Sequence, residues 1–206
     1  MFLVLDFTQS LSFALAGNNS FITKALKTKK NISEILILEI EKFLIKTNTN
    51  IKEINSIYVI TGPGSFTGVR SALTFAKSLS LTFNLNIFGI SKFEIMNHKS
   101  KIKQLNKCIL LHFKDNQFFV QTFEKNKPIN DPRLVNFDNE KLGYNSQTVY
   151  IYENSVLEQA LGEKIFNKMK ENFCLVEYNL DEMQEMIANN IINNIDPKPL
   201  YISNYY

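Results

Sequence analysis

A chain of 206 residues with 45% hydrophobic side chains is long enough to bury a real core, as one large domain or two small ones. No apolar run approaches the roughly 20 residues that cross a bilayer, and the N-terminus lacks a basic leader and a small-residue cleavage site. We therefore expect a cytoplasmic protein that makes no membrane contact. Cys108 and Cys174 each lie in a strand-like apolar run, which favours buried thiols over a disulfide or a metal pair.

The net charge of +3 is divided unevenly along the chain. Residues 1–105 hold 13 Lys and Arg against 6 Asp and Glu, whereas residues 106–206 hold 10 against 14. A basic half attracts RNA or an acidic partner. However, Lys27, Lys29 and Lys30 lack the interleaved aromatic residues of a nucleic-acid platform, so we interpret them as a solvated face rather than a primary RNA site.

The first half of the chain predicts the order βββαβα with one more strand and a short helical segment. Asn31 followed by Glu34 marks a helix start, and apolar residues then recur at helical spacing. The expected helices cover 32–45 and 69–83, with the short segment starting at Ser91. The expected strands are 2–6, 10–16, 20–26, 56–61 and 86–90.

The second half predicts a similar but degraded order without a sequence repeat. A polar stretch at 126–147 is expected to be irregular, and the prolines at 197 and 199 are expected to stop the last helix. The expected strands are 107–113, 117–124, 148–152 and 173–178. The expected helices run from about 155 to 170 and from Asp181 onward.

The most specific stretch reads ITGPGSFTGVR, from Ile60 to Arg70. It carries a strand into an amphipathic helix, where backbone N–H groups and the helix dipole favour an anion. Gly62 and Gly64 permit close approaches, and Ser65 or Thr67 can cap the helix. A phosphate loop requires a Lys after its last glycine, but Gly68 is followed by Val69. The pattern therefore indicates either a tight connection, which we favour, or a ligand loop.

As a whole string, Gly62-Pro63-Gly64-Ser65-Phe66-Thr67-Gly68 resembles the signature of the TsaB (YeaZ) family, a bacterial subunit of the machinery that makes threonylcarbamoyladenosine in tRNA. The resemblance runs from Met1 to about His98. It resumes weakly at the C-terminus, where Pro199 and Tyr201 match the family's Pro-x-Tyr-Leu-Arg ending but the arginine is missing.

This resemblance implies an α/β protein with the actin-like, ribonuclease-H-like (ASKHA) fold, built from two tandem half-domains with mixed sheets. The first, 1–104, would carry the signature and the partner-binding helices. The second, 105–206, would be smaller and degenerate, with a C-terminal tail that can return to the first.

Asp6 ends the first strand, where an acidic residue of actin-like ATPases and sugar kinases holds a nucleotide-bound metal. The family commonly reads Asp-Thr-Ser, whereas here Phe7 intervenes, and no second phosphate loop is recognisable. We interpret Asp6 as structural and expect no cofactor or metal of the chain's own. The candidates for nucleotide contact are Asp6, Gly62, Gly64 and Ser65, with ADP or ATP at an interface with TsaD and TsaE left open.

Catalytic groups are scarce in the sequence. The catalytic relative TsaD carries a His-x-x-x-His metal site, whereas this chain has only His98 and His112, too far apart in sequence for that pair. The resemblance therefore implies a non-catalytic subunit that pairs with TsaD, joins TsaE, meets tRNA only within the complex and forms a homodimer in isolation. The alternatives are an independent actin-like ATPase, a glycopeptidase-type hydrolase or a stand-alone homodimeric scaffold.

Two helices are uncharged or apolar on too many sides to be ordinary solvated helices. In the 32–45 helix the expected core stripe is Ile32, Leu36, Ile40, Phe43 and Leu44. In the 69–83 helix, small hydroxyl residues lie opposite the core, which suits close approach of another helix. The predicted partner-binding residues are Ile35, Leu38, Ile45, Ser71, Thr74, Phe75, Ser78 and Thr82. The alternative is that the chain's own second half covers both helices.

Overall fold

The computed structural model describes residues 1–17, 20–28, 31–102, 106–138, 147–162, 166–167 and 170–202. Contacts divide the chain into two compact units. Unit 1 holds Met1–Lys92 and Leu180–Leu200, and unit 2 holds Phe93–Asn179 and the described residues from Tyr201 on. The division implied by the family resemblance falls after residue 104 and stays a prediction.

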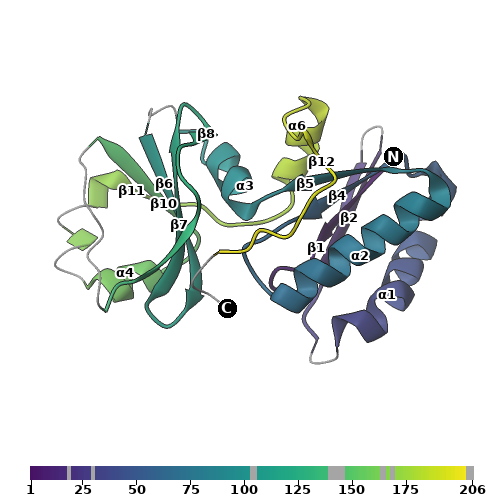
Figure 1. The fold of residues 1–206 in the computed structure, drawn as a ribbon, viewed down its shortest axis with the longest axis horizontal. Helices are drawn as coiled ribbons and strands as arrows, with labels where there is room; N and C mark the ends of the chain where they lie inside the picture. Colours follow the sequence, from purple (N-terminus) through teal and green to yellow (C-terminus); the bar gives the residue numbers. More distant parts are fainter. Residues whose placement is uncertain are drawn as a thin grey trace. The chain divides into compact units, whose positions relative to one another are not determined.

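Unit 1 is built on a six-stranded mixed sheet in the order β12-β5-β4-β1-β2-β3 (Figure 1). β1, β2 and β3 form an antiparallel meander, while β4 and β5 add to β1 as parallel strands. The strands are β1 Phe2–Asp6, β2 Leu11–Gly17, β3 Ser20–Leu26, β4 Ser56–Ile60, β5 Asn86–Ile90 and β12 Asn194–Ile195. The five strands predicted for the first half are therefore confirmed to within one residue at each end.

Two helices, α1 (Ile32–Lys46) and α2 (Phe66–Phe83), lie side by side on one face of this sheet (Figure 1). A one-turn 3-10 helix, η1 (Ile51–Glu53), follows α1. The helices bury one stripe each against the apolar side chains of β1, β2 and β4. In α1 the predicted stripe is confirmed, because Leu36, Ile40 and Phe43 are buried and Ile32 and Leu44 pack partly buried against the same core.

The last helix is shorter than predicted. α6 covers Glu182–Ala188 and ends at consecutive asparagines, where Asn190 takes a left-handed conformation with φ 52°. The Ile191 N–H then donates to the Met186 carbonyl at 2.9 Å, closing the helix end. The expectation that the prolines at 197 and 199 stop the helix was wrong. The chain has by then formed β12, which pairs with β5.

Unit 2 contains a second mixed sheet, in the order β11-β10-β6-β7-β8, with β9 paired to β7 (Figure 1). β6 and β7 are antiparallel, whereas β10 and β11 add to β6 in parallel. The strands are β6 Asn106–Lys114, β7 Gln117–Glu124, β8 Lys127–Pro128, β9 Arg133–Asn136, β10 Thr148–Tyr152 and β11 Phe173–Leu175. The helices are α3 Lys92–Lys99, α4 Val156–Leu161 and the 3-10 helix η2 Lys170–Asn172.

Three predictions for unit 2 need correction. The stretch 126–147, expected to be irregular, contains β8 and β9, and part of it lies outside the described residues. The helix expected over 155–170 ends at Leu161, because Gly162 follows with a φ of 75° that suits a helix terminus. The strand expected over 173–178 stops at Leu175.

Among the described residues, no helix combines the length and the apolar character needed to cross a membrane.

Candidate functional site

The signature turn links β4 to α2. The Thr61 N–H donates to the Ile90 carbonyl at 2.9 Å, which ties the start of the turn to β5. Ser65 is the N-cap of α2, and its Oγ accepts the Gly68 N–H at 3.1 Å. Of the two capping candidates, Ser65 therefore takes the role, and Thr67 lies inside the first turn of the helix.

The turn packs against the segment that follows β1. The Ser65 N–H donates to the Thr8 carbonyl at 2.7 Å. A Cβ placed on Gly64 would lie 2.5 Å from both the Thr8 carbonyl oxygen and the Thr8 Cβ, and one placed on Gly68 would overlap the Phe7 carbonyl oxygen. These two glycines are thus required for close backbone approach, which supports the tight-connection interpretation of the signature.

Asp6 is buried and takes part in this packing. Its Oδ1 accepts hydrogen bonds from the Thr8 N–H at 2.9 Å and from the Thr8 hydroxyl at 2.6 Å. A carboxylate that closes a turn on the residue two positions ahead is a common way to fix a loop. This geometry supports a structural role for Asp6.

The four candidate residues for nucleotide contact lie near one another, but atoms of Thr8 and Leu200 occupy the space beside them. Thr8 contacts Asp6, Gly64 and Ser65. Gly62 faces Leu200, since the Leu200 N–H donates to the Thr61 carbonyl at 2.8 Å and a Cβ on Gly62 would lie 3.5 Å from the Leu200 carbonyl oxygen. Sequence reasoning missed Thr8 and Leu200. The contact of Thr8 with Asp6 could have been predicted from the spacing of two residues between them. Nothing in the sequence predicts that Leu200 lies beside Gly62.

Metal-binding groups do not converge in the described part of the chain. No group of three or more His, Cys, Asp and Glu residues there is placed to hold a metal ion. The Nε2 of His112 lies 3.1 Å from the Asp115 carbonyl oxygen, and its ring packs on Phe118. Burial raises the pKa of the Cys108 thiol to about 12, and burial also raises the pKa of Cys174, so both thiols stay protonated at neutral pH.

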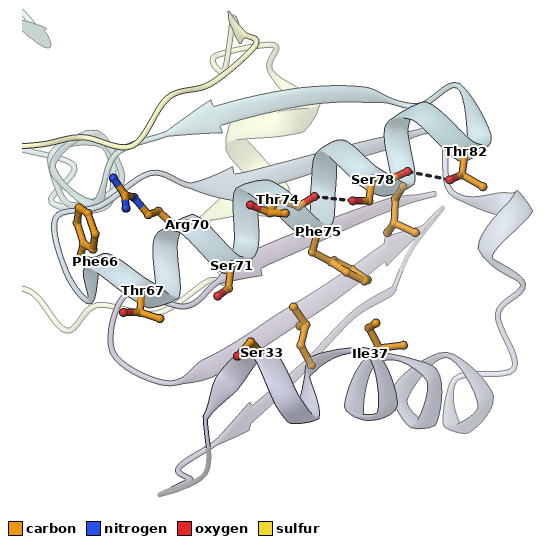
Figure 2. A pocket seen from close by; sticks show the side chains of 12 residues that line it. Ser33, Ile37, Phe66, Thr67, Arg70, Ser71, Thr74, Phe75, Ser78 and Thr82 are labelled. Atoms are coloured by element: carbon orange, nitrogen blue, oxygen red, sulfur yellow. Dashed lines mark hydrogen bonds between the residues drawn. The ribbon is translucent and has the colours of Figure 1, made fainter.

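A groove with a volume of about 680 Å³ lies between α1 and α2 (Figure 2). Small, hydroxyl and apolar side chains dominate its lining, and α2 supplies most of them. The lining residues are Ser33, Leu36, Ile37, Phe66, Thr67, Arg70, Ser71, Thr74, Phe75, Ser78, Leu79 and Thr82.

The predicted partner-binding residues divide into two groups. The five on α2 all line the groove: Ser71, Thr74, Phe75, Ser78 and Thr82. The three on α1 do not. Ile35 packs partly buried against the core, while Leu38 and Ile45 are 51% and 72% exposed outside the lining.

Ile37, which sequence reasoning did not select, lines the groove and is 70% exposed. Ser33 and Ile37 are four residues apart and therefore share the side of α1 that faces α2. This spacing of four residues could have identified from the sequence the side of α1 that faces α2.

Two hydroxyl groups along the groove side of α2 bond to their own helix. Ser78 Oγ donates to the Thr74 carbonyl at 2.9 Å, and Thr82 Oγ1 donates to the Ser78 carbonyl at 2.8 Å, as the dashed lines in Figure 2 show. At the other end of the groove, the Arg70 guanidinium stacks on the Phe66 ring, 3.7 Å from its centroid. Among the described lining residues, Arg70 is the one with a charged side chain.

Comparison with known proteins gives matches in sequence and in structure. Residues 25–126 match the family model of TsaD, tRNA N6-adenosine threonylcarbamoyltransferase. The tRNA threonylcarbamoyladenosine biosynthesis protein TsaB of Buchnera aphidicola subsp. Acyrthosiphon pisum (strain APS) is 27% identical over 196 residues, covering 93% of this chain and 80% of that protein. TsaB of Buchnera aphidicola subsp. Schizaphis graminum (strain Sg) is 36% identical over 83 residues, 40% of each protein.

Two solved structures from Pseudomonas aeruginosa share the fold. An uncharacterized protein with similarity to peptidase YEAZ superposes with a TM-score of 0.68 at 12% identity, covering 98% of both chains. YeaZ itself superposes with a TM-score of 0.65 at 13% identity, covering 98% of this chain and 99% of that one.

The two mixed sheets, together with these matches, define a protein of the actin-like, ribonuclease-H-like class, as predicted. Within that class, the chain is similar to TsaB over nearly its full length. The resemblance to the TsaB (YeaZ) family drawn from the signature turn is confirmed by these matches.

Proposed function

We propose that this chain is the non-catalytic subunit of the bacterial tRNA N6-threonylcarbamoyladenosine machinery that binds and supports the TsaD transferase and joins TsaE. Similarity to TsaB proteins supports involvement in this biosynthesis. In this proposal the protein is cytoplasmic, forms a heterodimer with TsaD, pairs with itself when TsaD is absent and meets tRNA only within the complex.

The observation that carries the partner-binding role is the groove between α1 and α2. Thr74, Ser78 and Thr82 are exposed along α2, and Ile37 is 70% exposed on the opposite wall. Leu38, Ile45 and Leu81 on the same two helices add further exposed apolar area. Surfaces of this kind are typical of protein interfaces, because burying them against a partner removes apolar area from water.

The lack of catalysis by the chain alone is supported by the chemistry of the signature region. Asp6 uses an oxygen to close its own turn through Thr8, and the glycines bring backbones together. A nucleophile or metal site needs several converging groups with shifted pKa values. We therefore assign no cofactor to the isolated chain, and place any ADP or ATP of the complex at an interface with TsaD and TsaE.

Reconstitution tests this function directly. TsaD, TsaE, the enzyme that forms threonylcarbamoyl-AMP and unmodified tRNA are incubated with and without the chain, and the modified nucleoside is measured by mass spectrometry. We expect modification only when the chain is present. Equal modification in its absence would refute the proposed function.

The rival function is that of an independent enzyme, either an actin-like ATPase or a glycopeptidase-type hydrolase. The name of one structural relative mentions similarity to a peptidase. The purified chain, incubated with ATP or with glycopeptides in the absence of TsaD, should give no more product than buffer. Sustained turnover that Asp6→Ala abolishes would favour the rival.

A further inference from the structure

The outer edge of β3 is a hydrogen-bonding surface that the fold of unit 1 does not use. β3 is the last strand of the unit 1 sheet, and within the described part of the chain its one strand pairing is with β2. Alternate residues of such a strand direct their N–H and C=O groups away from the neighbouring strand. Because β3 is seven residues long, these groups form a row to which another extended chain can add as a strand.

The side chains of β3 leave this edge accessible on both faces of the sheet. Ile22 is 43% exposed, and Thr23 and Ala25 are exposed as well. Ile22 lies opposite Leu15 in the register with β2, so it projects from the face that packs against α1. Thr23 lies opposite Ala14 and projects from the other face. These β-branched side chains suit cross-strand contact with an added strand.

The charge around this edge is positive. Glu39 of α1 lies between two ammonium groups, with Lys24 Nζ at 2.9 Å and Lys42 Nζ at 3.0 Å, so two positive charges face one negative charge. Lys27 follows the end of β3, is exposed and has no acidic partner among the described residues. The sequence contains no Asp or Glu from Phe7 to Ser33. An acidic chain is therefore attracted to this edge, whereas like charges oppose its pairing with a second copy of β3.

We propose that the edge of β3 accepts an extended segment of a partner protein, which adds antiparallel to β3 and carries Asp or Glu at the end beside Lys27. Main-chain hydrogen bonds supply the affinity, and the carboxylates select the segment and set its direction. Since β3 runs toward Lys27, the acidic residues stand at the N-terminal end of the added segment. No described residue of β3 lines the α1–α2 groove, so this inference goes beyond the proposed function and does not depend on it.

Amide hydrogen exchange of the full chain, with and without a designed peptide, tests the proposal. The probe is a blocked peptide in which an Asp pair precedes alternating Thr and Val residues over the length of β3, and its control carries a Lys pair instead. With the Asp peptide we expect exchange of the β3 amides that face away from β2 to slow by about tenfold. The amides of β10 in unit 2 should exchange as before.

Charge reversal tests the role of Lys27. Lys27→Glu should weaken binding of the Asp peptide, measured by fluorescence anisotropy, by about fivefold, because an exposed charge pair is reversed. Lys52→Glu is an equal reversal at an exposed residue outside β3, and it should leave the Kd unchanged. Thermal melting of each variant checks that it is folded.

The other outcomes would overturn the inference. If no β3 amide slows at a peptide concentration of about 1 mM, the edge does not take a strand. If the Lys peptide binds as tightly as the Asp peptide, charge does not select the occupant. Slowing of the β3 amides with rising protein concentration alone would assign the edge to a second copy of the chain. Binding of a single-stranded RNA oligonucleotide that Lys27→Glu weakens and the Asp peptide does not displace would assign the lysines to a phosphate backbone.

Discussion

The signature turn and the α1–α2 groove belong to the same unit and share α2, yet the turn is filled by the chain's own groups whereas the groove is open. The turn is rich in glycine and hydroxyl groups, as ligand loops are, but Thr8 and Leu200 fill the places that its glycines face. The groove carries a line of Ser and Thr on α2, and the hydroxyls of Ser78 and Thr82 are bonded within the helix. The comparison shows that the type of a polar residue says less about its availability to a ligand or a partner protein than do the contacts it already makes.

Replacing Gly64 with Val tests whether the turn is closed, and we expect the largest effect from this change. The new Cβ would lie 2.5 Å from Thr8 atoms, so the backbone of the turn must move. We expect the free energy of unfolding to fall by about 3 kcal/mol, measured by denaturant unfolding. Binding to TsaD should be lost together with this stability. Gly17→Ala is the control, since its Cβ would be in ordinary contact with Met1, and wild-type behaviour of Gly64→Val would mean that the turn is open.

Ser78→Arg tests the other side of the comparison. Ser78 is exposed, so the free energy of unfolding of the variant should stay within about 0.5 kcal/mol of that of the unaltered chain. A long cation in the line of small residues should nevertheless keep another helix away and weaken TsaD binding by about 100-fold in calorimetric titration. Retained affinity would show that the interface lies elsewhere on the protein.

A paired substitution on α1 sharpens the boundary of the groove. Ile37 lines it, whereas the neighbouring Leu38 is exposed outside the lining. Ile37→Asp should weaken TsaD binding by about tenfold, since an unpaired carboxylate would be buried at the interface. Leu38→Asp should have a clearly smaller effect. The reverse order would restore Leu38 to the contact surface that its sequence position first suggested.

The smallest effect is expected from Asp6→Asn. The amide keeps an oxygen for the Thr8 N–H and the Thr8 hydroxyl but loses the charge that strengthens both bonds. We expect about 1 kcal/mol of lost stability, read from thermal melting, and tRNA modification in the reconstituted system close to that of the unaltered chain. Loss of modification by a variant that is folded and still bound to TsaD would identify Asp6 as a functional residue.

Much of unit 1 followed from the sequence because its signals are local. Alternating strands, the Asn31–Glu34 start of α1 and the Ser65 cap of α2 depend on neighbouring residues, and each was found close to its expected place. Gly162 and Asn190 mark the ends of their helices with a positive φ, a signal that the apolar spacing around them concealed. Ile37 was missed because helical spacing identifies the buried side of α1 more clearly than it identifies which exposed side faces α2.

The return of the C-terminal segment to unit 1 is in line with the family resemblance, but it has no local signal in the sequence. The pairing of β12 with β5 and the bond from Leu200 to Thr61 join residues more than 100 positions apart. Unit 2 lies between them in sequence, so neither periodicity nor turn chemistry can predict the contact. The same distance in sequence explains why Leu200 was not foreseen beside Gly62.

This return also has a consequence for synthesis on the ribosome. The outer edge of β5 and the approach to Gly62 are covered by residues 194–200, with the Lys77 Nζ to Asp196 Oδ1 ion pair at 3.1 Å adding a further attachment. When Met1–Lys92 has emerged, that segment has yet to be translated, so the nascent unit presents an unpaired strand edge until unit 2 has been made. Exposed edges of this kind promote pairing between nascent chains. The order of translation therefore delays the last step of folding of the first unit until almost the whole described chain exists.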